Sequence, residues 1–461
     1  MKPLKKIYPC EITDMLGDVF YYPSDLCGVV DFADKEAVCF GHRAHQADIR
    51  SNPSIRQTFA LSRSLAETLY FPETETSLHV FPYQNSIHIG PLVGIFSAGF
   101  GPFLTKPLGE RSSFFSKLLS LNKTTGCIPF IFGENHINWE QETIRGYVYQ
   151  DNQWDICEFP FPNVIYDRLP NRKTENKTGP KEVKRKFQTD YSIPWYNPGF
   201  FNKWDVYERL IDDERAIPYL PVTYPFQSFS IVETLLSEHR QVYIKPIHGS
   251  LGLGIHQVLY DKHDDVYYCR YRDHENENRL KRFSTLESML KHVFKNKRID
   301  HLIVQQGISL IRNNRRPIDF RVHTNKDLDG DWQVTAIAAK IAGEGSITTH
   351  VKNGGTIMTL DELFGDDDTV FEVHQQLSKA ALILSEAIEE HLDGIVAEIG
   401  FDLGLDKQGQ VWMFEANSKP GRSIFSHPKL QEFELLTRKL ALDYAVYLTE
   451  QSLASTGGLQ K

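Results

Sequence analysis

A β-hairpin with acidic residues on one face is predicted by residues 399–417, which read IGFDLGLDKQGQVWMFEAN. Two apolar runs flank a turn at Gln408-Gly409, and symmetric pairing about that turn sets Asp402 opposite Glu415. Opposed residues have Cβ atoms only about 4.5–5.5 Å apart, so two carboxylates there repel each other. We therefore expect a cation between them, and expect that removing one carboxylate leaves the metal-free fold as stable or slightly more so.

The same hairpin supplies further candidate metal ligands. Symmetric pairing also sets Asp406 opposite Val411. Asn417 lies two residues after Glu415 and shares a strand face with it and with Asp402. Three hard oxygen ligands on one face suit Mg²⁺, which takes one or two carboxylates and completes its octahedron with water and phosphate oxygens.

A glycine-rich turn follows a second apolar strand, in residues 242–255, VYIKPIHGSLGLGI. Glycines let backbone N–H groups wrap an anion closely, and Lys245 at the end of the strand adds positive charge for phosphates. In a Walker loop the lysine follows the glycines and opens a helix, whereas here it precedes them and a β pattern resumes. The alternative is a glycine-rich hairpin with a surface lysine.

A third hairpin turns at Asp329-Gly330. Symmetric pairing about this favoured turn sets Asp319 opposite Lys340 and Arg321 opposite Ala338. Alternate residues of its first strand share one face, and these are Asp319, Arg321 and His323. They form either part of a ligand site or a structural ladder of ion pairs.

Length and composition indicate a multidomain globular protein. The chain has 461 residues, of which 41% are hydrophobic and 24% charged. A net charge of −9 argues against nucleic acid as a partner, because binding to the phosphate backbone needs a basic surface. Six cysteines are scattered with no metal-like spacing and are expected to be reduced. We see no window apolar enough for a membrane span and expect a cytoplasmic protein.

Three units are expected along the chain. Residues 1–85 alternate short apolar runs with turn residues, which indicates a β-rich unit. Residues 86–186 show a strand, helix, strand order typical of an α/β domain. The basic segment 171–186 is interpreted as a solvated linker into a third unit, 187–461, which ends in a helix over about 429–451.

In order and spacing, these features resemble the ATP-grasp superfamily. They are Lys203 in a Phe-Asn-Lys-Trp sequence, Lys245 before its glycines, the Asp319 hairpin, and Asp402 with the later acidic strand. Residues 415–421, EANSKPG, resemble the E-x-N-x-x-P-G end of D-alanine:D-alanine ligases and glutathione synthetases.

Within that superfamily the chain is most similar to the YheC/YheD type, the endospore coat-associated proteins of spore-forming bacilli. The supporting stretches are NPGFFNKW at 197–204, RPIDFRV at 316–322 and NGG at 353–355. The resemblance extends from about Gly90 to the C-terminus, and the chain length favours the YheD type. It implies an α/β and α+β architecture in which two ATP-grasp lobes, about 187–308 and 309–461, follow a pre-ATP-grasp α/β domain and the β-rich unit.

The resemblance also implies roles for individual residues. It predicts that ATP is bound by Lys203, Lys245, His248, Gly249, Ser250, Gly252, Gly254, Gln305, Gln306, Gly307, Ile308 and Asp319. Within this set, residues 305–308 correspond to the hinge whose backbone reads adenine, and residues 248–254 to a loop that closes over phosphates. Magnesium ligands are expected to be Asp402, Glu415 and Asn417.

The expected catalytic residues are Lys340, Arg321 and Arg422. Lys340 matches a further cation that contacts phosphate. D-Ala ligases carry an arginine two residues before the hairpin aspartate, where this chain has Gly400, so we expect Arg321 or Arg422 to substitute for it and do not expect D-Ala ligase activity.

The expected reaction transfers the γ-phosphoryl group of ATP to a carboxylate, and an amine then attacks the acyl phosphate. Two alternatives stay open: a morphogenetic protein of the spore coat whose ATP site is regulatory, and a kinase with a hydroxyl acceptor. The expected partners are ATP, Mg²⁺, an unidentified carboxylate and amine, and proteins of the spore coat. The expected location is the cytoplasm of the mother cell or the coat itself.

Overall fold

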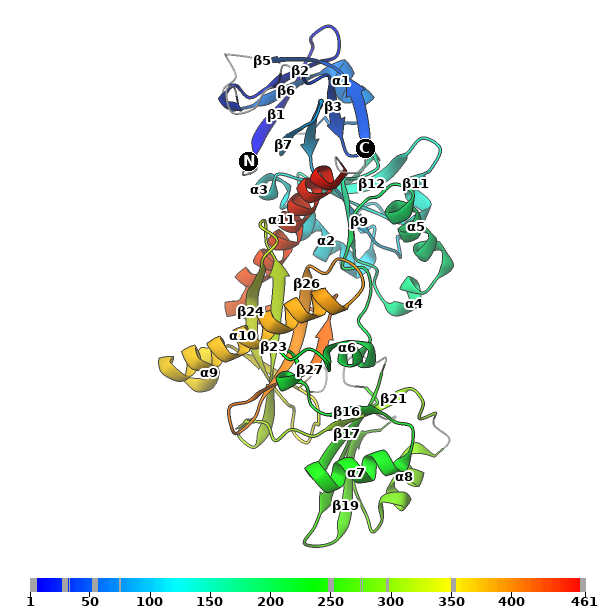
Figure 1. The fold of residues 1–461 in the computed structure, drawn as a ribbon, viewed down its shortest axis with the longest axis vertical. Helices are drawn as coiled ribbons and strands as arrows, with labels where there is room; N and C mark the ends of the chain where they lie inside the picture. Colours follow the sequence, from blue (N-terminus) through cyan, green and yellow to red (C-terminus); the bar gives the residue numbers. More distant parts are fainter. Residues whose placement is uncertain are drawn as a thin grey trace.

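The computed structural model describes residues 6–26, 32, 34–51, 57–73, 76–247, 253–273, 275, 277–295, 298–349 and 354–456. In this part of the chain the strands form four sheets along an elongated body (Figure 1). The N-terminal sheet lies at one end of the long axis and the sheet that contains Lys245 lies at the other. None of the described helices combines the length and apolarity needed to cross a bilayer.

The first sheet has the strand order β4-β3-β8-β7-β1-β6-β2-β5. Its strands are β1 (Tyr8–Thr13), β2 (Val19–Tyr22), β3 (Ala37–Phe40), β4 (Arg43–Gln46), β5 (Asp48–Ser51), β6 (Phe59–Ser62), β7 (Ser77–Tyr83) and β8 (Ser86–Gly90). Two short helices accompany them, η1 (Ser24–Leu26) and α1 (Arg63–Thr68). Phe20, Phe40 and Phe59 are fully buried within this unit, which is β-rich as predicted.

The second sheet has parallel strands at its centre. Its strands are β9 (Leu92–Phe96), β10 (Ile128–Phe132), β11 (Ile137–Asn138), β12 (Thr143–Gln150), β13 (Gln153–Pro160), β14 (Val164–Asp167) and β15 (Trp195–Tyr196). β9 pairs in parallel with both β10 and β14. Every residue of β9 and β10 is buried, as expected for strands covered on both faces. The helices near this sheet are η2 (Gly109–Arg111), α2 (Ser112–Leu119), α3 (Asn122–Thr125) and η3 (Glu134–His136).

The basic segment 171–186 is helical, so its interpretation as a linker is wrong. It forms α4 (Arg172–Glu175) and most of α5 (Thr178–Thr189). Val183 and Phe187 are buried four residues apart on one face of α5, in the same core as Trp195. The charged residues of α5 take the solvent side, and the helix therefore covers a face of the second sheet.

The third sheet is antiparallel, with the order β16-β21-β17-β18-β19-β20. Its strands are β16 (Thr223–Pro225), β17 (Gln241–Pro246), β18 (His256–Asp261), β19 (Val266–Arg272), β20 (Asn278–Phe283) and β21 (Leu302–Gln306). The helices α7 (Phe229–His239) and α8 (Leu286–Phe294) pack on it around Val242, Ile244 and Val304. The glycine-rich stretch connects β17 to β18, as the sequence predicts.

The fourth sheet carries the acidic hairpin and has the order β25-β24-β23-β26-β27, with β22 paired to β23. Its strands are β22 (Arg312–Asn313), β23 (Arg316–Lys326), β24 (Trp332–Ile341), β25 (Thr356–Met358), β26 (Glu398–Leu405) and β27 (Val411–Asn417). One face is apolar and packs against α6 (Lys203–Leu210) and α10 (Asp367–His391). The short helices beside it are η4 (Ile217–Tyr219), α9 (Leu360–Phe364), η6 (Ser423–Ser426) and η7 (Pro428–Leu430).

The last helix, α11 (Gln431–Thr456), joins the second sheet to the fourth. Tyr444 and Ala445 share a buried core with Val93 and Ile95 of β9, while the same helix contacts β23 and β24. In Figure 1 this red helix lies between the two sheets. The face of the fourth sheet that lies opposite α10 is therefore next to the second sheet. The division of the chain at residues 85, 186 and 308 stays a prediction.

Candidate functional site

Lys245 links the third and fourth sheets. Its Nζ donates to Gln305 Oε1 at 2.8 Å within the third sheet and to the Phe414 carbonyl of β27 at 3.2 Å. The Gln305 amide is oriented by a bond from its Nε2 to Thr223 Oγ1 at 2.9 Å. Burial, followed by the nearby Lys203, lowers the pKa of Lys245 to about 8. Among the described residues, this buried ammonium donates to two neutral oxygens, so it is well placed to receive an anion.

The predicted hinge continues from β21. Gln306 Oε1 accepts a bond from the Val222 N–H at 3.1 Å, and the Gly307 N–H donates to the Gln241 carbonyl at 2.8 Å. A Cβ on Gly307 would lie 2.5 Å from Gln241 Cγ and 2.7 Å from its carbonyl oxygen. Only glycine allows the chain to pass this close to β17, and Ile308 follows as a buried residue.

The acidic hairpin has the predicted pairing at its functional end. Asp402 is opposite Glu415. Near the turn, however, Val411 is opposite Leu405 and not Asp406, because the turn is one residue longer than a symmetric two-residue turn. A bulge further along the strands restores the register, so the two carboxylates face each other.

The extra residue of this bulge is Phe414. It lies between Met413 and Glu415 on β27, and its carbonyl is the one that Lys245 contacts. Its ring packs over Gly404, where a Cβ would lie 2.5 Å from the ring. The bulge thus turns a backbone acceptor of the fourth sheet toward the third.

The third predicted hairpin has both expected pairs, Asp319 with Lys340 and Arg321 with Ala338. Its other neighbour is β26, which sets Arg321 directly opposite Asp402. The charged residues of β23 and β26 therefore meet on the face opposite the apolar core.

These charges form a compact ladder. Lys340 Nζ lies 2.8 Å from Asp319 Oδ1 and 2.7 Å from Asp402 Oδ1. Arg321 Nε lies 3.1 Å from Asp402 Oδ1, and Thr349 Oγ1 donates to Asp319 Oδ2 at 2.5 Å. Burial raises the pKa of Asp319 in spite of Lys340. Burial alone would also raise the pKa of Asp402, but Arg321 and Lys340 lower it to about 2.

The second carboxylate of the predicted metal site has its own cation. Lys203 Nζ, at the start of α6, lies 3.2 Å from Glu415 Oε1. Lysine and arginine side chains thus supply positive charge that relieves the repulsion between Asp402 and Glu415, and the metal site stays a prediction. Asn417 is opposite Gly400 and donates from Nδ2 to its carbonyl at 3.4 Å.

The donor set fits Mg²⁺. The Asp402 and Glu415 carboxylates are cross-strand neighbours at the end of a cationic cluster, and Asn417 follows on the same strand. Carboxylate and amide oxygens are the hard donors that this ion prefers.

The structure distinguishes the two candidate arginines. A Cβ on Gly400 would lie 2.8 Å from Arg321 Nη1 and 2.4 Å from Pro420 Cβ, so Arg321 reaches this position from the neighbouring strand. Arg422 instead turns away from Asp402, and its Nη2 donates to Glu398 Oε1 at 2.8 Å.

Of the predicted phosphate loop, His248, Gly249, Ser250 and Gly252 lie outside the described residues. Gly254 is described and has a φ of +73°, a left-handed conformation that favours glycine.

Three contributors to the site escaped the sequence analysis. Glu398 could have been found, because it is four residues before Asp402 on β26 and so shares its face. Thr349 and the bulged Phe414 carbonyl carry no signal in a single sequence.

A pocket lies between the third and fourth sheets beside these charges. Polar and apolar side chains line it: Lys203, Val206, Tyr207, Leu220, Thr223, Lys245, Ile303, Gln305, Met413, Phe414, Glu415 and Ala416. The polar groups among these are Lys203, Thr223, Lys245, Gln305 and Glu415, and the accessible volume between the side chains is about 20 Å³.

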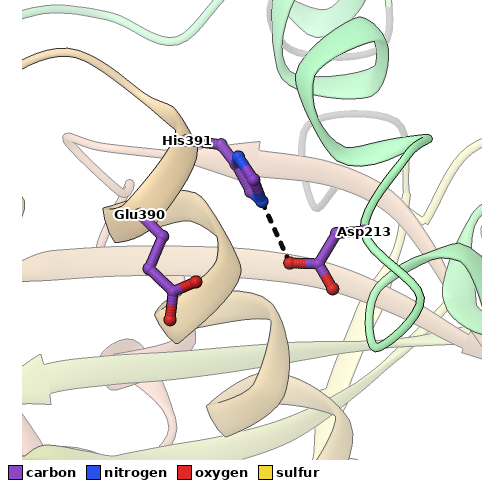
Figure 2. Close-up of side chains that lie close together, drawn as sticks. All are labelled: Asp213, Glu390 and His391. Atoms are coloured by element: carbon purple, nitrogen blue, oxygen red, sulfur yellow. Dashed lines mark hydrogen bonds and ion pairs between the residues drawn. The ribbon is translucent and has the colours of Figure 1, made fainter.

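A separate acidic cluster lies on the other side of the fourth sheet. Figure 2 shows Glu390 and His391 at the end of α10 near Asp213, with a bond between His391 Nε2 and Asp213 Oδ2 of 3.0 Å. Arg215 Nη2 lies 2.7 Å from Asp213 Oδ2 and 2.6 Å from Glu390 Oε2, and it holds the pKa of Asp213 well below its usual range. A guanidinium already bridges the carboxylates, so this cluster is an ion-pair network.

Known proteins are similar to the chain along most of its length. A family model described as YheC/D-like ATP-grasp matches residues 192–448. The endospore coat-associated protein YheD of Bacillus subtilis (strain 168) is 42% identical over 420 residues, which are 91% of this chain and 92% of the relative. YheC of the same organism is 23% identical over 292 residues, 62% of this chain and 78% of that protein.

Among solved structures, D-alanyl-alanine synthetase A from Vibrio cholerae is 12% identical with a TM-score of 0.42, covering 79% of this chain and 99% of that one. The family model spans more than half of the sequence and agrees with the 42% identity to YheD. The chain therefore belongs to the YheC/YheD-like ATP-grasp family.

Proposed function

We propose that the protein binds Mg·ATP between the third and fourth sheets and uses it to join a carboxylate to an amine. The observation that carries this proposal is one buried cluster in which Lys203, Lys245 and Lys340 meet Asp402 and Glu415. Cations suited to phosphates and carboxylates suited to a metal are needed together for phosphoryl transfer.

The nucleotide would lie along the pocket. Its phosphates would contact Lys203 and Lys245, and the adenine would lie against the hinge at residues 305–308, with the apolar lining of the pocket around it. The loop of residues 248–254 would cover the phosphates. Asp319 would act through Lys340, which it pairs at 2.8 Å.

Magnesium held by Asp402, Glu415 and Asn417 would neutralise charge on the β- and γ-phosphates. An acceptor carboxylate oxygen attacks the γ-phosphorus, the bond to the β–γ bridging oxygen breaks, and ADP leaves. Lys340 and Arg321 stabilise the charge that develops. The amine then attacks the acyl carbon, and inorganic phosphate departs as the amide forms.

Arg321 is the proposed contact for the acyl oxygen. Its Nη1 is buried without a hydrogen-bond partner in the described part of the chain, and it lies beside Gly400. A donor positioned before the reaction stabilises charge in the transition state without reorganisation.

The test uses purified protein with Mg·ATP and an extract of sporulating cells, and measures ADP and the mass of the product. Hydroxylamine should trap the acyl phosphate as a hydroxamate, and Lys245→Met should abolish both the release of ADP and the formation of hydroxamate. The matched control is Lys262→Met, which removes an exposed lysine. A stable phosphorylated product without hydroxamate would support the kinase alternative, and Mg·ATP binding without any turnover would support the regulatory one.

We also propose that the protein acts in formation of the endospore coat, in the cytoplasm of the mother cell or in the coat, with coat proteins among its partners. The name of the relative that is 42% identical supports this assignment. A fluorescent fusion protein found inside the forespore, and neither in the mother-cell cytoplasm nor in the coat, would contradict it.

A further inference from the structure

We propose that a cluster of arginines beyond the catalytic face binds a second anionic group of the acceptor. The acceptor would then be an elongated molecule with a reacting carboxylate at one end and another carboxylate or a phosphate at the other. This inference rests on the ligase function proposed above, because it assigns the substrate class of that site.

Three guanidinium groups surround one aromatic ring. The Cζ atoms of Arg168, Arg422 and Arg438 lie 5.0, 5.2 and 5.0 Å from the ring centroid of Phe114. Phe114 belongs to α2 and Arg438 to α11, whereas Arg168 and Arg422 follow β14 and β27. Segments from the second sheet, the fourth sheet and α11 thus converge on this point.

The Glu398 carboxylate forms ion pairs with two of these arginines. Arg168 Nη1 lies 3.1 Å from Glu398 Oε2, and Arg422 Nη2 lies 2.8 Å from Oε1. The Tyr166 hydroxyl also donates to Glu398 Oε2 at 2.7 Å. Asp167, next in sequence to Arg168, is already paired with Lys419 at 2.6 Å.

The positive charges of Arg438 and Arg111 have few carboxylates beside them. Arg438 Nη2 lies 2.7 Å from Glu434 Oε1, and Lys117 shares that carboxylate at 3.7 Å. Arg111 donates from Nη1 to Ser97 Oγ at 3.0 Å and from Nη2 to the Ala98 carbonyl, which are both neutral.

Among the described residues, four guanidinium groups therefore have two carboxylates within ion-pair distance. The groups counted are Arg111, Arg168, Arg422 and Arg438, with Glu398 and Glu434. The excess is two positive charges in a region from which water is largely excluded. A buried charge without a counterion is costly, so an anion that entered here would be bound favourably.

Unused hydrogen-bond donors lie at the same point. Arg438 Nε and Nη1 and Arg422 Nε have no hydrogen-bond partner among the residues that the structure describes. The Arg438 side chain is only 2% exposed. A buried donor without a partner has lost its water without compensation, and the fork of a guanidinium matches two oxygens of a carboxylate or phosphate.

The distance to the catalytic end determines the length of the acceptor. Glu398 and Asp402 lie four residues apart on β26, which corresponds to about 13 Å along a strand. Arg422 contacts the first and Arg321 contacts the second. His323, opposite Gly400, lies between them, and within the described residues its two ring nitrogens also have no hydrogen-bond partner.

Inorganic phosphate is the probe for this site. The full-length protein is first saturated with Mg²⁺ and a non-hydrolysable ATP analogue, so that the phosphate subsites of the nucleotide are filled, and phosphate is titrated calorimetrically at constant ionic strength. We expect binding that Arg438→Gln weakens at least tenfold. Arg298→Gln, which removes an arginine of the third-sheet unit that is 76% exposed, should bind as wild type does.

Wild type without phosphate binding, or Arg438→Gln with unchanged affinity, would overturn the proposal and make the cluster a structural junction. Should Arg438→Gln not fold, Arg438→Lys keeps the charge and loses the bidentate fork, so the same weakening is expected of it. Affinity for the ATP analogue is measured separately. If phosphate binding depends on Arg438 but the ATP analogue does not bind, the ligase site alone is refuted. If the analogue binds but phosphate binding does not depend on Arg438, the arginine site alone is refuted.

Dicarboxylates of increasing chain length test the spacing. Those that can span about 13 Å should bind the wild-type complex at least tenfold more tightly than the matching monocarboxylates, and this advantage should vanish in Arg438→Gln. Equal affinity of mono- and dicarboxylates at every length would refute an elongated acceptor.

Discussion

Replacing Asp402 by asparagine removes the carboxylate on which the charged ladder converges. Its Oδ1 lies 3.1 Å from Arg321 Nε and 2.7 Å from Lys340 Nζ, and its Oδ2 accepts a hydrogen bond from Arg321 Nη2 at 3.3 Å. The lowering of the Asp402 pKa from 3.8 to about 2 corresponds to about 2–3 kcal/mol in favour of the ionised form. Removing one partner of a buried ion pair costs roughly 3–5 kcal/mol. We therefore expect the free energy of unfolding of the nucleotide-free protein to fall by about 2–4 kcal/mol.

This expectation reverses the one drawn from the sequence, where only repulsion from Glu415 was visible. The sign follows from the pKa: a carboxyl group whose pKa is lowered by folding stabilises the protein above its unfolded pKa and stops doing so as the pH falls toward 2. The deficit of Asp402→Asn should therefore be constant between pH 5 and 8.

Thermal melting without ligand, supported by hydrogen exchange in β23 and β26, measures this deficit. Asp393→Asn is the matched control, because it removes a carboxylate that is 92% exposed. Mg·ATP should raise the melting temperature of the wild type and of the control, and much less that of Asp402→Asn. If Asp402→Asn melts at or above the wild type without ligand, repulsion from Glu415 outweighs the ion pairs and our account of the ladder fails.

Three other substitutions test separate parts of the structure. Lys245→Met should lose Mg·ATP binding but melt no lower than wild type without nucleotide at pH 7. Wild-type stability should rise between pH 8 and 10.5, because in this range the lysine of the folded protein has lost its proton and that of the unfolded protein has not. An identical rise in the variant would rule out this lysine as the source. Gly307→Ala should destabilise the third sheet by about 1–3 kcal/mol through a clash with β17, seen as faster hydrogen exchange in β21; unchanged exchange would disprove the close approach. Lys419→Met leaves the buried carboxylate of Asp167 unpaired and should cost about 3–5 kcal/mol, with faster proteolysis between the second and fourth sheets; wild-type resistance would show that the pair is dispensable.

Local patterns in the sequence were sufficient for much of the ATP-grasp region. Alternation of apolar and polar residues with period two predicts which side chains share a strand face, and Asp-Gly and Gln-Gly mark the turns. The pairs Asp319–Lys340 and Asp402–Glu415 follow from these rules and are present in the structure. They hold although both hairpins contain a bulge, because each bulge compensates for a turn that is one residue longer than assumed.

Sequence reasoning failed where burial depends on a distant partner. Segment 171–186 has the composition of a linker, yet Val183 fits the core beside β15 and the segment becomes a helix. Likewise, a lone strand does not reveal that Arg321 reaches the position of the missing Gly400 side chain from the neighbouring strand.

The strands, the turns and the order of the charged motifs could be predicted without a structure, because each depends on residues that are close together along the chain. The pairing of opposite charges could not, because it depends on segments that are far apart along the chain. Lys245 contacts the Phe414 carbonyl, 169 residues away along the chain, and Arg168 contacts Glu398, 230 residues away. Such contacts arise from the packing of separate sheets, and no periodicity within one segment specifies them.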